Sequence, residues 1–155
     1  VSRRYWSMEG ERLDMDGPLA MGTGDMMIVE LLVYSKKYRP DLLLVDLLPA
    51  GLEIENQNLA DSTKLGDIVI DGEKIGQRLR SAGVVHEEFR DDRYVAALRT
   101  GGGGRWGTRP ARMYYIARAV TPGTYNVPNP LLEDMYDPEA RAIGSTIPEL
   151  VIQPR

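Results

Sequence analysis

The sequence predicts a mainly β protein, an antiparallel β-sandwich of about eight to ten strands with one short helix. Short apolar runs recur along the 155 residues, and 16 glycines and 10 prolines are spread between them as turn residues. Only one segment combines helical spacing with a capping residue. This length suits one domain, so we expect residues 1–155 to form a single domain whose core needs no cross-links.

Four strands are predicted in the first half of the chain, at residues 2–8, 26–34, 41–48 and 52–55. In the first strand, Tyr5 and Trp6 point to opposite faces because side chains alternate along a strand. The second strand is apolar on both faces except at Glu30, and the short loop 35–40 predicts that it pairs antiparallel with the third. Since one sheet face cannot cover so much apolar surface, we expect the helix or a neighbouring domain to cover the rest.

The predicted helix covers residues 71–81. Asp71 is a suitable N-cap, Ile75 and Leu79 lie one turn apart, and Gly83 follows just past the end.

The second half of the chain predicts two hairpins and a last strand, with strands at residues 84–90, 93–99, 114–120, 124–127 and 150–152. Asp91-Asp92 supplies the first turn. Thr121-Pro122-Gly123 supplies the second, because proline presets φ and glycine accepts a positive φ. The glycine-rich segment 100–110 is expected to join strand 94–99 to the strand at 114 as a long hairpin loop.

Composition argues against several function classes. The chain has no cysteine, so disulfides and cysteine-ligated metals are excluded. Its single histidine, His86, lies beside Glu87 and Glu88 and is interpreted as a surface residue rather than a zinc ligand or a catalytic base. A net charge of −4 with 27% charged residues is not typical of nucleic-acid binding. No apolar run has the length of a membrane span.

Three local patterns approach known sites but fit them poorly. Asp14-x-Asp16-Gly17 begins like a calcium loop, but a proline and Asp25 occupy two ligand positions, so a solvated turn is the better interpretation. The four glycines at 101–104 lack the Gly-Lys-Ser/Thr ending of a phosphate loop. Adjacent carboxylates such as Glu133 and Asp134 point to opposite faces of a strand, whereas glycoside hydrolysis needs a facing pair. We therefore predict no catalytic, cofactor-binding or metal-binding residue.

Two aromatic residues are candidates for binding a partner or a sugar if their side chains are exposed. Trp106 lies in the glycine-rich segment, and Tyr136 lies between prolines. Each has a second interpretation: Trp106 folded back on the sheet, and Tyr136 as a core or corner tyrosine. Together with Met135 and Pro138, they are our predicted partner-binding residues.

Five motifs, in order along the chain, carry a family resemblance. They are DLLPAGLE (46–53), NLADS (58–62), EFRDDRYV (88–95), YIARAVTPGTY (115–125) and EDMYDPE (133–139). Together they resemble the C-terminal macroglobulin-like domain of bacterial α2-macroglobulins. The last two motifs are the most specific, and the resemblance covers most of the chain.

The resemblance implies a non-enzymatic binding and packing domain, without a cofactor, of a large periplasmic protein that traps proteases in envelope defence. The parent protein of such a domain is often lipid-anchored at the inner membrane. Implied partners are a thioester-type domain of the same polypeptide, target proteases bound through the parent, and a peptidoglycan synthase or accessory proteins encoded nearby. One subgroup uses a Cys-Gln thioester, which a chain without cysteine does not contain.

We expect the chain to be a piece of a longer polypeptide, because it begins at Val1 without an initiator methionine or a signal segment. Either one sheet face or the run 128–138 is expected to dock on the thioester-type domain or on a partner. No nucleic acid and no membrane insertion are expected.

Two other functions stay open from the residues alone. A carbohydrate- or surface-binding module would need Trp6, Trp106 and Tyr136 to line one concave surface. A carboxylate enzyme would need acidic side chains to converge in a pocket.

Overall fold

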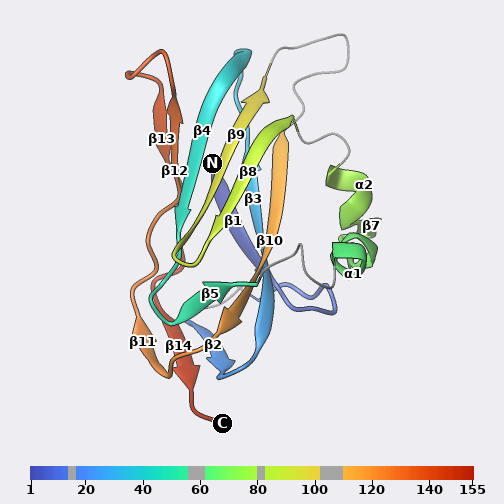
Figure 1. The fold of residues 1–155 in the computed structure, drawn as a ribbon, viewed down its shortest axis with the longest axis vertical. Helices are drawn as coiled ribbons and strands as arrows, with labels where there is room; N and C mark the ends of the chain where they lie inside the picture. The colour runs from blue at the N-terminus through green and yellow to red at the C-terminus, as the bar shows by residue number, and fades with distance from the viewer. Residues whose placement is uncertain (14–16, 56–61, 80–82, 102–109) are drawn as a thin grey trace.

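The computed structural model describes residues 1–13, 17–55, 62–79, 83–101 and 110–155. These residues form a mainly β fold, as predicted (Figure 1). They contain fourteen strands and two short helices, where about eight to ten strands and one helix were expected. The first strands are β1 (Ser2–Trp6), β2 (Leu19–Gly22), β3 (Met26–Val33), β4 (Arg39–Leu47) and β5 (Leu52–Ile54). The middle elements are α1 (Ser62–Asp67), β6 (Val69–Ile70), β7 (Glu73–Lys74), α2 (Ile75–Leu79), β8 (Val84–Arg90) and β9 (Arg93–Thr100). The last strands are β10 (Ala111–Ala119), β11 (Gly123–Tyr125), β12 (Leu131–Asp134), β13 (Arg141–Ile143) and β14 (Leu150–Gln153).

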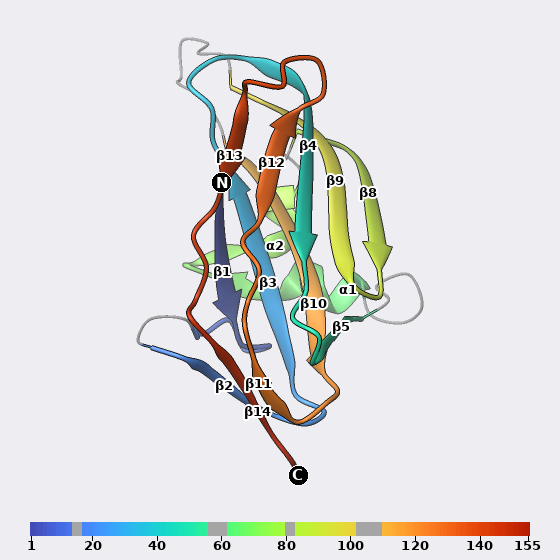
Figure 2. The same ribbon diagram turned by 90° about the vertical axis from the view of Figure 1, so that its left-hand side faces the viewer.

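Two large sheets pack face to face, with a smaller sheet at one end (Figure 2). The strand order is β1-β3-β10-β5 in one large sheet and β13-β12-β4-β9-β8 in the other. The small sheet has the order β11-β14-β2, and β6 pairs with β7 alone. All strand pairs are antiparallel except β14 with β2, which is parallel.

The main core lies between the two large sheets. Alternate side chains of each strand point inward, so β4 contributes Leu42 and Leu44 while its other apolar residues face outward. Three tyrosines are also buried here, at positions 5, 94 and 115, and the rings of Tyr94 and Tyr115 stack with centroids 5.2 Å apart.

The expected pairing of strand 26–34 with strand 41–48 is wrong. β3 pairs with β1 and β10, β4 pairs with β9 and β12, and residues 34–38 cross from one sheet to the other. The short connection suits a hairpin and a sheet crossing equally. The partners that β3 takes instead, β1 and β10, lie earlier and much later in the chain.

Two further hairpins predicted from the sequence are also wrong. β9 and β10 belong to different sheets, so segment 100–110 does not join a pair of neighbouring strands. β10 pairs with β3 and β5, whereas β11 pairs with β14. The hairpin around Asp91-Asp92 is confirmed, with Arg90 opposite Arg93. The turn residues thus predict where a strand ends, but they do not predict which strand it pairs with.

The helical region also differs from the prediction. Asp71 does not cap a helix: it has φ +49°, Gly72 has φ +78°, and together they turn β6 into β7. Positive φ at both central residues is the requirement of the Asp-Gly hairpin turn. The helix α2 begins only at Ile75, and α1 was not predicted. Among the described residues, neither helix has the length and apolar composition needed to cross a membrane.

The segment from α1 to α2 covers the outer face of the four-stranded sheet (Figure 1). Leu65, Ile70 and Ile75 pack there in a second cluster that includes Trp6 and Ile28. Of the two covers expected for the second apolar face of strand 26–34, the helix or a neighbouring domain, the structure shows the helical segment in that place. Tyr5 and Trp6 lie in the two different clusters, as alternation requires.

A buried carboxylate lies within this second interface. Glu30 is fully buried and accepts hydrogen bonds from Trp6 Nε1 (3.1 Å), the Tyr114 hydroxyl (2.7 Å), Arg112 Nη1 (2.9 Å) and Arg78 Nη1 (3.3 Å). Burial raises the pKa of Tyr114 to about 12, so its hydroxyl remains a donor at neutral pH. Because Arg78 belongs to α2, this network links the helical segment to β3.

Candidate functional site

The turn between β12 and β13 is held by its own backbone and by one carboxylate. Asp134 Oδ1 accepts hydrogen bonds from the amides of Tyr136 (3.0 Å) and Asp137 (3.1 Å). The Asp134 amide donates to Ala140 O at 2.9 Å, and the Met135 amide donates to Asp41 O of β4 at 2.9 Å. An aspartate that accepts from amides two and three residues ahead fixes a turn locally. The sequence therefore builds a defined turn where it reads Asp-Met-Tyr-Asp.

Arg39, at the start of β4, fastens the same turn from the side. Its Nη1 lies 3.0 Å from Asp134 Oδ2 and 3.1 Å from Asp137 Oδ2. The hydrogen bond from the Tyr136 amide and then the one from Arg39 hold the pKa of Asp134 below its usual value. The carboxylates of Asp137 and Asp134 in turn raise the pKa of Arg39. The turn is thus an ordered arrangement of charges rather than a loose connection.

This turn points two large apolar side chains into solvent. Tyr136 is 81% exposed and Met135 is 48% exposed, and Pro138 beside them is exposed as well. The interpretation of Tyr136 as a core or corner tyrosine is therefore wrong. Three of the four predicted partner-binding residues lie together, whereas Trp106 lies outside the described residues.

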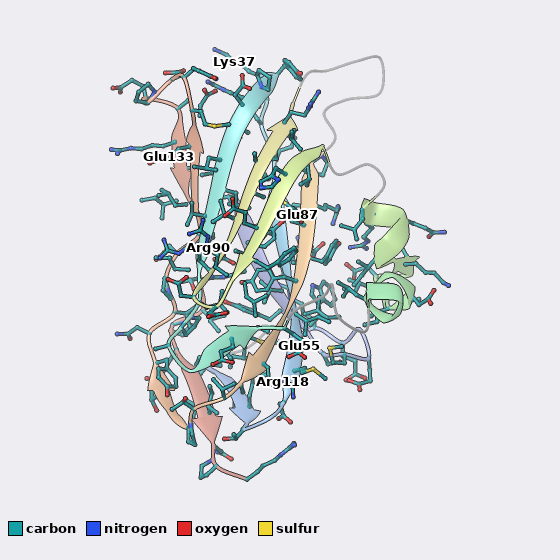
Figure 3. All side chains as sticks on the ribbon, in the orientation of Figure 1. Lys37, Glu55, Glu87, Arg90, Arg118 and Glu133 are labelled. Carbon is teal, nitrogen blue, oxygen red and sulfur yellow. The ribbon has the colours of Figure 1, made fainter. Side chains whose placement is uncertain are left out.

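Further exposed aromatic residues lie at the same end of the molecule. The connection from β3 to β4, which carries Lys37, runs past the β12–β13 hairpin at the top of Figures 1 and 3. This connection includes Tyr34, 55% exposed, and Tyr38, 57% exposed. Sequence reasoning missed both tyrosines and missed Arg39, since it placed Tyr34 at the end of the predicted strand 26–34 and the other two residues in the short loop 35–40.

The arrangement has the features of a binding surface. Tyrosine, methionine and arginine are enriched in the centres of protein interfaces, where aromatic anchors fill pockets on the partner. A turn fixed in advance loses little conformational entropy when it binds. We call the exposed surface of Tyr34, Tyr38, Met135, Tyr136 and Pro138 the tyrosine tip.

The structure gives little support to the other kinds of site considered from the sequence. Trp6 is 3% exposed, so it does not line a surface with Tyr136 as a carbohydrate-binding module would require. His86 is exposed and lies 3.5 Å from Glu88. Among the described residues, no three histidine, cysteine or acidic side chains gather as metal ligands would.

One open cavity of about 400 Å³ lies between the ends of β1, β2 and β3. Glu9 and Asp25 line it, but Asp25 is already paired with Arg155 at 2.6 Å and accepts the Gly22 amide at 2.8 Å. This cavity lies at the opposite end of β3 from the tyrosine tip. Its lining gives no facing pair of free carboxylates for acid–base chemistry.

Comparison with known proteins gives one consistent family. The family model described as the bacterial alpha-2-macroglobulin MG10 domain matches residues 1–139. Over 99% of its length, the chain is 47% identical to an alpha-2-macroglobulin of Xylella fastidiosa (strain Temecula1 / ATCC 700964) and 40% identical to that of Escherichia coli (strain K12). It spans only 9% of the length of these relatives.

Solved structures agree with this result. The native conformation of E. coli alpha-2-macroglobulin matches 99% of the chain with a TM-score of 0.80 and 37% identity, over 9% of that protein. The same protein activated by porcine elastase matches with a TM-score of 0.82 and 38% identity, over 13% of that chain. In these structures the matching domain is a small part of a much larger protein. Sequence, motif order and fold therefore lead to one conclusion, that the chain belongs to the bacterial alpha-2-macroglobulin MG10 domain family.

Proposed function

We propose that the chain is a non-catalytic binding domain of a longer α2-macroglobulin-like polypeptide, and that the tyrosine tip docks on the thioester-type domain of that polypeptide. The observation that carries this proposal is the exposure of Tyr136, 81%, on a turn that hydrogen bonds and ion pairs hold in place. The turn fixes the backbone at Tyr136, and burial of the exposed ring in a partner's pocket would remove its apolar surface from water. The tip therefore has the character of an interface left without its partner.

The parent molecule supplies the context of this docking. We propose a periplasmic protease trap acting in envelope defence, with a lipid anchor elsewhere in the polypeptide. A protease would cleave the parent, and the tip would be released or retained in the rearrangement that follows. A peptidoglycan synthase and operon-encoded accessory proteins are further candidate partners of the parent. The relatives support a protease trap because one of them is described as activated by elastase.

Side-chain labelling of the full-length parent tests the docking directly. Tyr136 would be nitrated and Met135 oxidised under limiting reagent, in the parent and in the separate 155-residue chain. We expect both side chains to react at least tenfold more slowly in the parent, because a docked tip excludes the reagents. Limited proteolysis of the parent should then change their reactivity. Met26, 37% exposed at the far end of β3, is the matched methionine reference.

Equal reactivity of Tyr136 in the parent and in the separate chain would reject docking of the tip inside the molecule. Protection that persists unchanged after proteolysis would keep the docking but make the domain a passive cap. A Tyr136→Ala parent should restore fast oxidation of Met135, because the docked contact loses its largest side chain. An unprotected tip would direct the search for a partner to neighbouring envelope proteins.

A further inference from the structure

Arg3 is a buried cation that touches three separate segments of the chain. Its side chain is 1% exposed, and it projects from β1 into the space between the two large sheets. Nη1 donates to Asp46 Oδ1 at 2.5 Å, and Nη2 donates to Thr146 Oγ1 at 2.7 Å and to Pro128 O. A guanidinium is the one side chain whose planar fork can reach several acceptors at once.

The anion of this network is equally buried. Asp46, on β4, is fully buried, and its second oxygen accepts the Tyr115 hydroxyl of β10 at 2.7 Å. The pair thus joins β1 and β10 of the four-stranded sheet to β4 of the five-stranded sheet. Ion pairs this deep are seldom the best choice for stability, because apolar residues of similar volume often serve as well. Their retention calls for another role.

The two remaining contacts of Arg3 indicate that role. Pro128 lies just before β12 and Thr146 lies just after β13, so the guanidinium holds both legs of the hairpin that ends in the tyrosine tip. The legs are also bonded to each other at this level, through Asn129 Nδ2 to Gly144 O at 2.6 Å. The Gly144 amide donates to Pro130 O at 2.8 Å.

We infer that Arg3, charged against Asp46, is the positioning residue of the β12–β13 hairpin and so sets where Met135 and Tyr136 point. Among the described strands, β12 pairs with β4 and β13, and β13 is an edge strand of three residues. Without a fixed base, such a hairpin can twist about its single partner strand. Arg3 supplies the fixed base from the opposite sheet. The functional consequence rests on the proposed docking of the tip, but the positioning itself does not.

Apolar replacement of the whole network separates positioning from stability. The triple variant Arg3→Met, Asp46→Leu, Tyr115→Phe removes every member of the buried pair together with the hydroxyl that depends on it, so no buried charge is left alone. Thr146→Val is the milder variant, since it keeps the ion pair and removes one leg contact. Backbone amide exchange would be measured on the full 155-residue chain for both variants. Urea unfolding would report global stability.

We expect the Gly144 and Asp134 amides to exchange at least tenfold faster in the triple variant and at least threefold faster in Thr146→Val. The exchange rates of the β3 and β10 amides should stay within twofold of their values in the original chain. In the parent, Tyr136 of the triple variant should be nitrated at least threefold faster, because a displaced tip docks less often. If the exchange rates of the hairpin amides stay within twofold of the original chain in both variants, Arg3 is not the positioning residue. If the triple variant does not fold, Thr146→Val alone decides by the same criterion.

The two proposals fail separately. Faster hairpin exchange combined with an unprotected Tyr136 in the unmodified parent would keep Arg3 as the positioning residue and reject the docking. Unchanged hairpin exchange combined with a protected Tyr136 in the unmodified parent would keep the docking and reject the positioning role of Arg3.

Discussion

Replacing Glu30 with glutamine should detach the helical segment from the sandwich before the sandwich itself unfolds. The substitution keeps the volume but removes the charge that faces Arg78 and Arg112. Arg78 is 7% exposed, so it would become a buried cation left with two exposed counter-charges, Glu73 at 3.3 Å and Asp71 at 3.8 Å. Breaking a buried pair in this way costs about 3–5 kcal/mol. With its amide oxygen at the Oε1 position, glutamine can still accept from Arg78, Tyr114 and Arg112, and only Trp6 Nε1 loses its acceptor, so we expect a loss near the lower limit, about 3 kcal/mol.

Thermal unfolding gives the first measurement. In a domain of this size, each kcal/mol lost from the free energy of unfolding lowers the midpoint temperature by about 2–4 °C. Glu30→Gln should therefore lower the midpoint by about 6–12 °C. Amide exchange gives the second, because the amide of Ile75 donates to Ile68 O within the helical segment and should lose protection first. Glu53→Gln is the matched control, since Glu53 is exposed on β5. It should shift the midpoint by less than about 2 °C.

A midpoint within 2 °C of the original chain for Glu30→Gln would refute the reasoning, because it would mean that Glu30 is not the main counter-charge of Arg78. Uniform loss of protection across β3, β10 and the helical segment would also contradict it. In that case the segment and the sandwich would form one cooperative unit.

Three further predictions concern the turns and the small sheet. The pKa of Asp134 is depressed in the folded chain, so its contribution to the turn is complete above the unfolded value of about 3.9 and is lost as pH falls through the lower folded value. The amide shift of Tyr136 followed by NMR should therefore titrate below pH 3.9, and a midpoint above that value would contradict the assignment. Gly51→Ala should lower the free energy of unfolding in urea by about 1–3 kcal/mol, because the added Cβ would press on the Tyr125 ring and lie 2.7 Å from Ile152 Cδ1. An unchanged free energy of unfolding would mean that these side chains move aside. Gly72→Ala meets no neighbouring atom within 4 Å but must adopt φ +78°, so it should cost about 1 kcal/mol by the same assay, and a gain in stability would disprove the left-handed turn.

The sequence predicted the strands far better than their partners. Alternation and β-branched runs identified most of the longer strands, because those signals depend on side chains that the strand itself carries. Pairing depends on residues far along the chain: Val29 has Tyr5 on one side and Tyr115 on the other, and no local pattern connects these three. The predicted hairpins failed for this reason wherever the chain crosses between sheets.

The candidate site was predicted in outline for a different reason. Tyr136 was selected as an aromatic residue between prolines, together with Met135 beside it, but the exposure of both had to come from the structure, since apolar side chains are more often buried. Arg39 and Arg3 were not predicted at all. Each acts on a segment about a hundred or more residues away, through contacts that only the folded chain creates.

The parallel pairing of β14 with β2 has a consequence for how the chain folds during synthesis. Leu150 lies opposite Leu19, and β14 is the central strand of its sheet, between β11 and β2. In the described part of the chain, β2 and β11 both pair with β14, so neither has its ladder partner until β14 has emerged from the ribosome. Closure of a contact across nearly the whole chain is slow, so Met21 and the other apolar side chains of β2 stay uncovered during that interval. Synthesis of β14, rather than emergence of the large sheets, therefore completes this fold.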